Sequence, residues 1–291
     1  MASDETTPRD AVAPADAGGT APAEATPGGL DLPAEMFRSG ENPTSVTVPF
    51  EKQLVGTVFR KVQATTVNGR LVFEGDIMLG RADQVLTAAV PRGIGRTGEG
   101  FRWPDGVVPW VAETALEPLV RAAIRHWEER TPIRFPPRTA ADPDFLSFKA
   151  LDGCWSSVGR QGGEQEISLG AGCGLGAAIH EIGHALGLWH EQSREDRDQH
   201  IEVLLQNVIP QFQHNFDQHV LDGDDLGHYD FNSIMHYPAT AFSRNGQPTL
   251  RARGGQPIGQ RQGLSAGDTA AIRILYPTLD WGSVPQQGPT G

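Results

Sequence analysis

The feature that most constrains this chain is a pair of histidines four positions apart, with a glutamate directly after the first: His180, Glu181 and His184. On an α-helix, side chains four apart project from the same face, so the two imidazoles can share one metal ion. Gly187 predicts the end of that helix, because glycine readily adopts the left-handed backbone that turns a chain. The turn brings His190 within reach as a third ligand.

Three neutral imidazoles are typical of a catalytic zinc centre, because they leave one position open for water and substrate. A purely structural zinc site, by contrast, usually has four protein ligands. Glu181 lies beside the first ligand, where a carboxylate can take a proton from a zinc-bound water whose pKa the metal has lowered. We therefore expect one Zn²⁺ per chain, held by His180, His184 and His190, with Glu181 as the general base.

The charge of the chain limits its partners. With 36 acidic and 24 basic residues, the net charge is −12 and the isoelectric point is near 5.2. Such a surface repels nucleic acid and anionic membranes, so we expect neither as a partner. No apolar run approaches the ~18 residues that a membrane-spanning helix needs. The first residues lack the basic and apolar regions of a recognisable signal peptide.

Changes in composition divide the chain into four parts. Residues 1–42 are rich in Pro, Ala and acidic side chains, which predicts a disordered tail. Residues 43–95 alternate apolar and polar side chains and contain an Asn-Gly turn, which predicts a small β-rich segment; we call it the N-terminal segment. Residues 96–279 form the main domain, and residues 280–291 form a flexible C-terminal tail.

The main domain is predicted to be α+β, because strand and helix patterns follow one another without βαβ alternation. Short strands are expected near residues 107–111, 145–149 and 166–169, and helices near residues 114–130 and 175–187. Capping boxes predict two helix starts, one at Thr114 with Glu117 and one at Ser265 with Asp268.

A family resemblance is carried by several of these motifs together. The segment HEIGHALGLWHEQSREDRD at residues 180–198 matches the metzincin consensus HExxHxxGxxH, and its continuation resembles the astacin family of zinc endopeptidases. The segment SIMHY at residues 233–237 resembles the Met-turn of that family. RWPDGVVPW and GCWSSVGRQGG, at residues 102–110 and 153–163, extend the resemblance to about two-thirds of the chain.

The resemblance implies a metzincin-type fold with a twisted mixed sheet, an active-site helix and a C-terminal helix, preceded by a small β-rich prosegment. It also implies a secreted or extracellular, monomeric endopeptidase that cleaves peptide or protein substrates through a Glu181-activated water. The alternatives are another metzincin subclass, a zinc-binding protein of the same fold that binds peptides without turnover, and an assembly module with a purely structural zinc. The intact Glu181 favours the enzyme.

Further residues receive roles from the resemblance. Tyr237 matches a tyrosine that ligates the resting zinc and then stabilises the oxyanion, a role that suits a phenol donor; the alternative is a packed aromatic in a turn. Met235 belongs to the Met-turn beneath the metal. Glu191 matches the residue that receives the new N-terminal ammonium after activation, although it and its charged neighbours also suit a structural ion network.

A second motif lies upstream, in the N-terminal segment. Phe73-Glu74-Gly75-Asp76 resembles the FxGD motif of astacin propeptides, in which the aspartate ligates zinc and displaces the water. Asp76 would then keep the enzyme latent; the alternative is an ordinary hairpin turn. Residues 89–100 are glycine-rich and contain two arginines, Arg92 and Arg96. We expect a trypsin-like protease to cleave after one of them and release the inhibitor.

The two cysteines of the chain are Cys154 and Cys173. Taken alone, they are equally consistent with a disulfide and with two buried thiols. The resemblance implies one of the two disulfides usual in animal astacins, with both halves of the other missing. The family also often selects an acidic residue just after the scissile bond through a late arginine. Arg253 is the candidate here, with Arg244 and Arg251 as alternatives.

Overall fold

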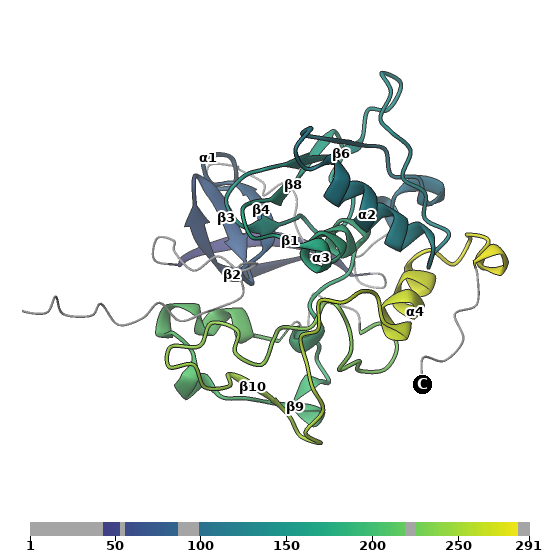
Figure 1. Ribbon diagram of the computed structural model, residues 1–291. Coiled ribbons are helices and arrows are strands. Elements are labelled where there is room, and N and C mark those ends of the chain that lie inside the picture. Colours follow the sequence, from purple (N-terminus) through teal and green to yellow (C-terminus); the bar gives the residue numbers. More distant parts are fainter. Residues whose placement is uncertain (1–42, 53–55, 87–98, 219–224, 285–291) are drawn as a thin grey trace, which may run out of the picture.

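The computed structural model describes residues 43–52, 56–86, 99–218 and 225–284 (Figure 1). The expectations for the tail of residues 1–42, for the arginines at 92 and 96 and for residues 285–291 lie outside this range. Within it, the chain forms a mixed arrangement of helices and several sheets, so the α+β prediction is confirmed.

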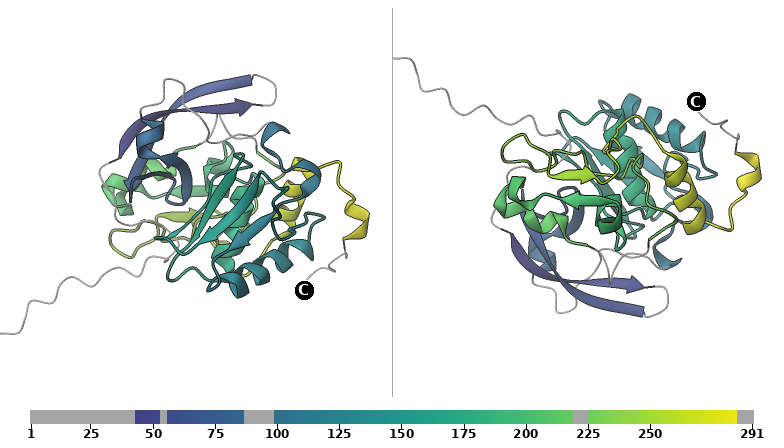
Figure 2. Two further views of the ribbon diagram at one scale, coloured as in Figure 1. Left: turned by 90° about the horizontal axis from the view of Figure 1, so that it is seen from above. Right: turned by 90° about the horizontal axis from the view of Figure 1, so that it is seen from below.

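The N-terminal segment folds as a four-stranded antiparallel sheet in chain order. Its strands are β1 (Thr44–Lys52), β2 (Gly56–Val67), β3 (Arg70–Phe73) and β4 (Ile77–Arg81), followed by a one-turn helix α1 (Ala82–Val85). Asn68 and Gly69 join β2 to β3 with φ angles of 48° and 73°, which these two residue types tolerate best. Both views of Figure 2 show the long strands β1 and β2 along one side of the molecule.

The main domain contains a second four-stranded sheet, ordered β5-β6-β8-β7. Its strands are β5 (Trp110–Ala112), β6 (Phe145–Lys149), β7 (Cys154–Trp155) and β8 (Glu164–Leu169). The β5–β6 and β6–β8 pairs are parallel and the β7–β8 pair is antiparallel, so the predicted mixed sheet is confirmed. Strand β8 leads into the loop that precedes the helix Leu175–Leu186.

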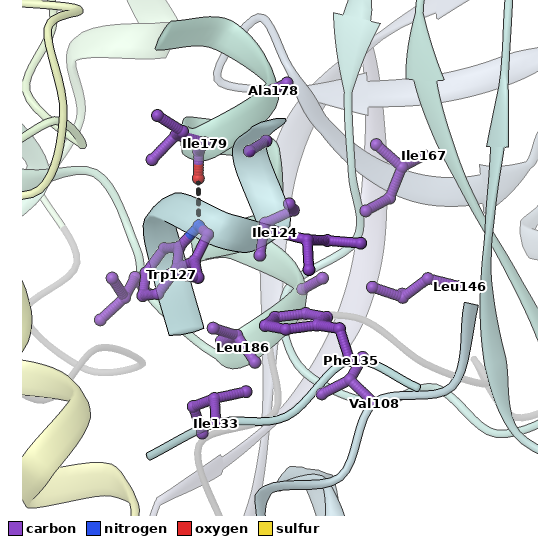
Figure 3. Close-up of a cluster of buried hydrophobic side chains, with 14 of the residues drawn as sticks. Val108, Ile124, Trp127, Ile133, Phe135, Leu146, Ile167, Ala178, Ile179 and Leu186 are labelled. Carbon is purple, nitrogen blue, oxygen red and sulfur yellow. Dashed lines mark hydrogen bonds between the residues drawn. The ribbon is translucent and has the colours of Figure 1, made fainter. Parts of the chain in front are cut away.

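Two long helices pack together on this sheet: α2 (Glu117–Glu128) and α3 (Leu175–Leu186). Apolar side chains of α2 recur on one face, and Figure 3 shows them meeting α3 and the strands in a single core. The indole Nε1 of Trp127 donates a 3.1 Å hydrogen bond to the carbonyl of Ile179 inside this core. That bond ties α2 to α3 one residue before His180.

The second half of the domain contains little regular structure, and Figure 1 shows β9 (Ile201–Val203) and β10 (Leu250–Ala252) as a two-stranded ribbon in its lower part. The last long helix is α4 (Ala266–Leu275). The 3₁₀ helices are Glu99–Phe101, Pro104–Gly106, Glu191–Ser193, Arg197–Gln199, Leu205–Asn207, Pro210–Phe216 and Trp281–Ser283.

One predicted helix start is wrong. Helix α2 begins at Glu117, its N-cap is Leu116 and no side chain caps it, so Thr114 does not form the predicted capping box. Residues 114–116 instead turn the chain, with the Glu117 amide bonded to the Thr114 carbonyl. At α4 the prediction is confirmed, because Ser265 and Asp268 cap each other's backbone reciprocally.

The structure joins Cys154 and Cys173 in a disulfide, which confirms the pairing implied by the resemblance. The bond connects β7 to the loop that precedes α3. Within the described residues, no helix is both long and apolar enough to cross a membrane.

Candidate metal centre

Helix α3 and the turn after it bring three histidines together. His180 and His184 lie one turn apart on α3, both almost completely buried. Gly187 ends the helix with a φ of 112°, the left-handed conformation that its position predicted. The chain then returns so that the ring centroid of His190 lies 4.7 Å from that of His184 and 5.5 Å from that of His180.

Asp76 of the N-terminal segment completes this group. Its carboxylate oxygens lie 3.3 Å from His180 Nε2, 3.7 Å from His184 Nε2 and 3.1 Å from His190 Nε2. All four candidate ligand atoms lie within 4.8 Å of one another. A tetrahedral zinc with bonds of about 2.0–2.1 Å places neighbouring ligand atoms about 3.3 Å apart. The spacing therefore fits a zinc ion at the centre of the four residues.

The buried polar atoms of the site also favour the binding of a cation. Within the described residues, no hydrogen bond reaches Asp76 Oδ1, His180 Nε2 or His184 Nε2, although all three atoms are buried. Burial lowers the pKa of His180 to about 3, so this imidazole is neutral and offers a lone pair. Buried, unpaired donor atoms are costly unless an ion satisfies them, so these residues suit a metal.

The opposite ring nitrogen of each histidine has a partner that fixes its orientation. His180 Nδ1 donates to the carbonyl of Ile234 at 2.8 Å, and His184 Nδ1 donates to the carbonyl of Leu188 at 2.8 Å. His190 Nδ1 donates to the carboxylate of Glu74, also at 2.8 Å. With its proton on Nδ1, each imidazole presents its Nε2 lone pair to the metal position.

Asp76 and His190 carry opposite charges in the absence of an ion. Burial disfavours a charge on His190, but the carboxylates of Asp76 and Glu74 outweigh it and raise the pKa of His190 to about 9. Burial likewise opposes ionisation of Asp76, yet the charge of His190 and the contacts with the three imidazoles hold its pKa well below the usual range. A bound metal ion would take over the positive charge that His190 otherwise carries.

Glu181 and Tyr237 lie next to this group in the structure. Glu181 directly follows His180 on α3 and is 1% exposed. The ring of Tyr237 lies 4.7 Å from that of His190, centroid to centroid, and its hydroxyl donates to the carbonyl of Glu74. Burial raises the pKa of Tyr237 well above its ordinary value, so the phenol is a neutral donor. Its role as a ligand of the resting zinc stays a prediction.

Met235 lies in a turn directly against α3. A side chain at Gly183 would meet the sulfur of Met235 at 2.7 Å, so the glycine is what lets the turn approach the helix this closely. The turn itself is held by Asp268, which accepts hydrogen bonds from the Ser233 hydroxyl at 2.6 Å and the Ile234 amide at 3.0 Å. The cap of α4 thus also positions the carbonyl that orients His180.

Glu191 lies at a small cavity of about 50 Å³ behind the metal centre, which Asp230 and Asp268 also line. It accepts a 2.7 Å hydrogen bond from the Asp230 amide and lies 3.6 Å from the guanidinium of Arg194. Burial raises the pKa of Glu191 to about 8. A cation entering this cavity would stabilise the ionised carboxylate, as the predicted ammonium would.

The arginines considered for substrate selection lie on or near the β9–β10 ribbon. Arg253 is exposed and donates to the carbonyl of Asp198 at 2.9 Å. Arg251 forms an exposed ion pair with Glu202 at 2.6 Å, and Arg244 is also exposed. The structure gives Arg253 no contact with the metal ligands, and its role stays a prediction.

Sequence reasoning missed three residues that hold the site together. Glu74 binds His190, Gln192 accepts from the Tyr237 amide at 3.0 Å, and Arg261 donates to the carbonyls of Ile234 and His236 at 2.9 and 3.0 Å. Glu74 had a signal, because it lies two positions before Asp76 in the same motif. Gln192 and Arg261 act on backbone groups brought near by folding, which no spacing in the sequence reveals.

Comparisons with known proteins show which family this chain resembles. Residues 96–277 match the model of the peptidase family described as Astacin. Blastula protease 10 of Paracentrotus lividus is 42% identical over 194 residues, which cover 61% of this chain and 32% of that protein. Meprin A subunit beta of Homo sapiens is 39% identical over 216 residues, which cover 70% of this chain and 29% of that protein. The chain thus spans about a third of the length of these two relatives.

Among solved structures, the chain is similar to high choriolytic enzyme 1, a hatching enzyme zinc-protease from Oryzias latipes. The TM-score is 0.57 and the sequence identity 38%, over 60% of this chain and 92% of that chain. The chain therefore belongs to the astacin family of peptidases, through residues 96–277, which match that family.

Proposed function

We propose that the protein is a zinc metalloendopeptidase that the N-terminal segment holds in a latent form. The observation that carries this proposal is the buried group of His180, His184, His190 and Asp76, in which the carboxylate comes from outside the matched peptidase domain. A peptidase site normally keeps one metal position for water and substrate. Here an aspartate points at that position.

One zinc ion per chain would be held by the three histidines, with Asp76 as the fourth ligand in the latent form. When bound, zinc lowers the pKa of a coordinated water towards ~7 and polarises a carbonyl group. The neutral state of His180 and the Nδ1 hydrogen bonds of all three imidazoles support this ligand set.

The chemistry assigned to the chain's own residues is direct hydrolysis. Glu181 takes a proton from the attacking water, the new C–O bond forms, and Glu181 delivers the proton to the amine as the C–N bond breaks. Tyr237 donates a hydrogen bond to the developing oxyanion once its hydroxyl leaves the Glu74 carbonyl. No covalent link between enzyme and substrate forms.

Activation would require cleavage of the chain between the two domains. A trypsin-like protease cutting after Arg92 or Arg96 would free the new N-terminus, whose ammonium would pair with Glu191. The buried position and raised pKa of Glu191 support such a partner, because a cation restores the charged carboxylate.

The setting of the enzyme is also proposed. The Cys154–Cys173 disulfide supports a secreted or extracellular location, because disulfides persist mainly in oxidising compartments. The protein would act as a monomer on peptide or protein substrates. Arg253 remains the candidate that selects an acidic residue just after the scissile bond.

The test is cleavage of a quenched fluorescent peptide library by the purified full chain, before and after limited trypsin digestion. Activity should rise after digestion and disappear with a zinc chelator. The Glu181→Ala variant should be inactive while metal analysis still finds zinc, since Glu181 is not a ligand. In an assay at high dilution, where a cleaved segment dissociates, equal activity before and after digestion would overturn the latency, and no cleavage by the digested, zinc-loaded protein would favour a peptide-binding module.

A further inference from the structure

The N-terminal segment inserts a second carboxylate into the metal centre besides Asp76. Glu74 is fully buried, and its Oε2 accepts the hydrogen bond from His190 Nδ1 at 2.8 Å. Its Oε1 accepts a 2.6 Å hydrogen bond from the hydroxyl of Ser193, three residues after that ligand. Both oxygens of Glu74 are therefore directed at the peptidase domain, behind the metal ligand.

This arrangement makes His190 different from the other two ligands. His180 and His184 donate to the backbone carbonyls of Ile234 and Leu188, which belong to the peptidase domain and remain after any cleavage. His190 alone donates to a charged group, and that group belongs to the segment that activation would remove. The third ligand therefore has a different partner before and after activation.

The backbone around Glu74 is adapted to this contact. Glu74 has a φ of 45° and Gly75 a φ of 79°, two consecutive residues in the left-handed region. This conformation is uncommon for a glutamate, so its contacts must compensate for the backbone strain. The turn directs the carboxylates of Glu74 and Asp76 towards the same histidine, one to each ring nitrogen.

We propose that Glu74 is a positioning residue that acts through His190 to tighten zinc binding in the latent protein. An imidazole that donates to a carboxylate is a more basic ligand than one that donates to water, and loss of such a partner typically lowers metal affinity about 10- to 100-fold. This inference rests on the proposed zinc peptidase function. It adds that the N-terminal segment strengthens zinc binding as well as blocking the open position on the metal.

A consequence is that the latent protein binds zinc more tightly than the activated enzyme. The segment supplies one ligand, Asp76, and strengthens another through Glu74, and both contributions are lost when the segment leaves. Without the carboxylates of Asp76 and Glu74, the three histidines would leave a bound zinc better able to polarise a substrate carbonyl. The site therefore competes best for scarce zinc while the protein is still latent, before activation.

The test uses the full-length latent protein loaded with zinc, as wild type, Glu74→Gln, Asp76→Asn and the double variant. Transfer of zinc to a chromophoric chelator gives the relative affinities. Glu74→Gln should lower the affinity by about 10-fold or more, and it should do so again in the Asp76→Asn background. Asp83→Asn is the matched control, because it removes an exposed carboxylate from the same segment and should leave zinc affinity unchanged.

Activation supplies an internal control. Once the segment is cleaved and removed, the wild type and the Glu74→Gln variant yield the same peptidase domain, so their zinc affinities must become equal. A second measurement, the Nδ1 proton resonance of His190 in the intact latent protein, should move upfield in Glu74→Gln because an amide oxygen is a weaker acceptor than a carboxylate. This resonance would not respond to a general loosening elsewhere in the segment.

Two results would overturn the inference. One is equal zinc retention by wild type and Glu74→Gln. The other is an effect of Glu74→Gln that vanishes in the Asp76→Asn background, since Glu74 would then act only by holding the Asp76 loop. Failure of the latency proposal is distinguishable, because it appears as an Asp76→Asn protein no more active than wild type before cleavage, whatever the chelator titration shows.

Discussion

At the scale of single residues, the site depends on hydrogen bonds that reach the ligands from behind. The carbonyl of Ile234 accepts both from His180 Nδ1 at 2.8 Å and from the guanidinium of Arg261 at 2.9 Å. Arg261 also donates to the carbonyl of His236, so one cation holds two carbonyls of the Met-turn. Arg261 thus helps to fix the carbonyl that orients His180, a candidate zinc ligand.

The first prediction concerns Tyr237. After activation, Tyr237→Phe should lower kcat about 100-fold with KM within a few-fold of wild type, because a donor that acts only on the developing oxyanion contributes to the transition state alone. Steady-state kinetics on one peptide of the library measures both constants.

Tyr276→Phe is the matched control for that variant. Its hydroxyl donates to the carbonyl of Leu186 at 3.0 Å, inside the core, so its loss should cost about 1–2 kcal/mol of stability. Its kcat should not change. If the two phenylalanine variants lose kcat equally, Tyr237 is a packed aromatic and not part of the catalytic machinery.

The second prediction concerns pH and His126 on α2. Its Nε2 accepts a 2.9 Å hydrogen bond from the Leu264 amide, and burial, with the nearby charge of Arg130, lowers its pKa from 6.5 to about 4. Because the pKa of His126 is lower in the folded protein than in the unfolded protein, the unfolded state binds the proton first as the pH falls. The stability present above pH 6.5 is therefore lost as the pH falls towards 4. The expected slope is at most about 1.4 kcal/mol per pH unit.

The comparison that isolates this effect is chemical denaturation of wild type and His126→Gln between about pH 7 and pH 4. Glutamine keeps a hydrogen-bond acceptor and does not titrate, so the free energy of unfolding should fall less steeply with acid in the variant. Loss of zinc at low pH affects both proteins equally and cancels in the difference. Parallel curves would show that His126 does not contribute to the acid sensitivity.

At the scale of elements, the sequence predicted the helix ends that are set by contacts between residues close in the chain. Ser265 and Asp268 form the predicted capping box, and Gly187 ends α3 as expected. Thr114 and Glu117 have the same spacing, yet α2 starts at Glu117 without a side-chain cap. The spacing of the two residues allows a capping box at both helix starts. At Thr114, the path of the chain after β5 prevents it.

The candidate site was predicted only where its residues are close in sequence or form a known motif. The histidine spacing on α3 and the Asp76 motif led to all four members of the buried group. Glu74 was missed because its partner, His190, lies 116 positions away, and Arg261 because it binds backbone carbonyls. Such contacts depend on the tertiary fold, so the motif that contains Glu74 does not name its partner, and no spacing in the sequence points to Arg261.

The third prediction concerns the Cys154–Cys173 disulfide, which closes a loop between β7 and α3. By chain entropy, a loop closed across 19 positions stabilises the fold by about 3 kcal/mol. The Cys154→Ala, Cys173→Ala double variant should therefore unfold at a clearly lower temperature. The activated variant should still cleave peptides at low temperature, since neither cysteine contacts a metal ligand.

Thermal unfolding of the double variant beside wild type, each with and without reductant, measures this contribution. Reductant should lower the transition of wild type towards that of the variant and leave the variant unchanged. A variant as stable as oxidised wild type would mean that the rest of the core already fixes this loop.

At the scale of the whole molecule, the N-terminal segment is held by the peptidase domain at several places besides the metal. The Met78 amide donates to the carbonyl of Ser156 at 2.8 Å, and the Ser156 amide donates to the carbonyl of Asp76 at 3.0 Å, beside the edge strand β7. Val158 and Trp189 of the peptidase domain pack in the apolar cluster of the segment. Arg70 forms a 2.8 Å ion pair with Glu166.

The last prediction follows from this docking: cutting the linker does not by itself produce an active enzyme. A segment that keeps its hydrogen bonds, apolar contacts and Asp76 after cleavage remains bound, so cleaved protein at high concentration should be mostly inactive. Its specific activity should rise on dilution, as an equilibrium between bound and free segment requires.

The measurement is specific activity of fully cleaved protein over a series of dilutions, with cleavage verified by mass spectrometry. Arg70→Ala should shift the rise in activity to higher protein concentration, because it removes the ion pair with Glu166 and leaves Asp76 in place. Arg81→Ala is its control, since Arg81 pairs with Asp83 inside the segment itself. Full activity at every concentration as soon as the linker is cut would mean that the covalent connection, and not the docked surface, keeps Asp76 at the zinc.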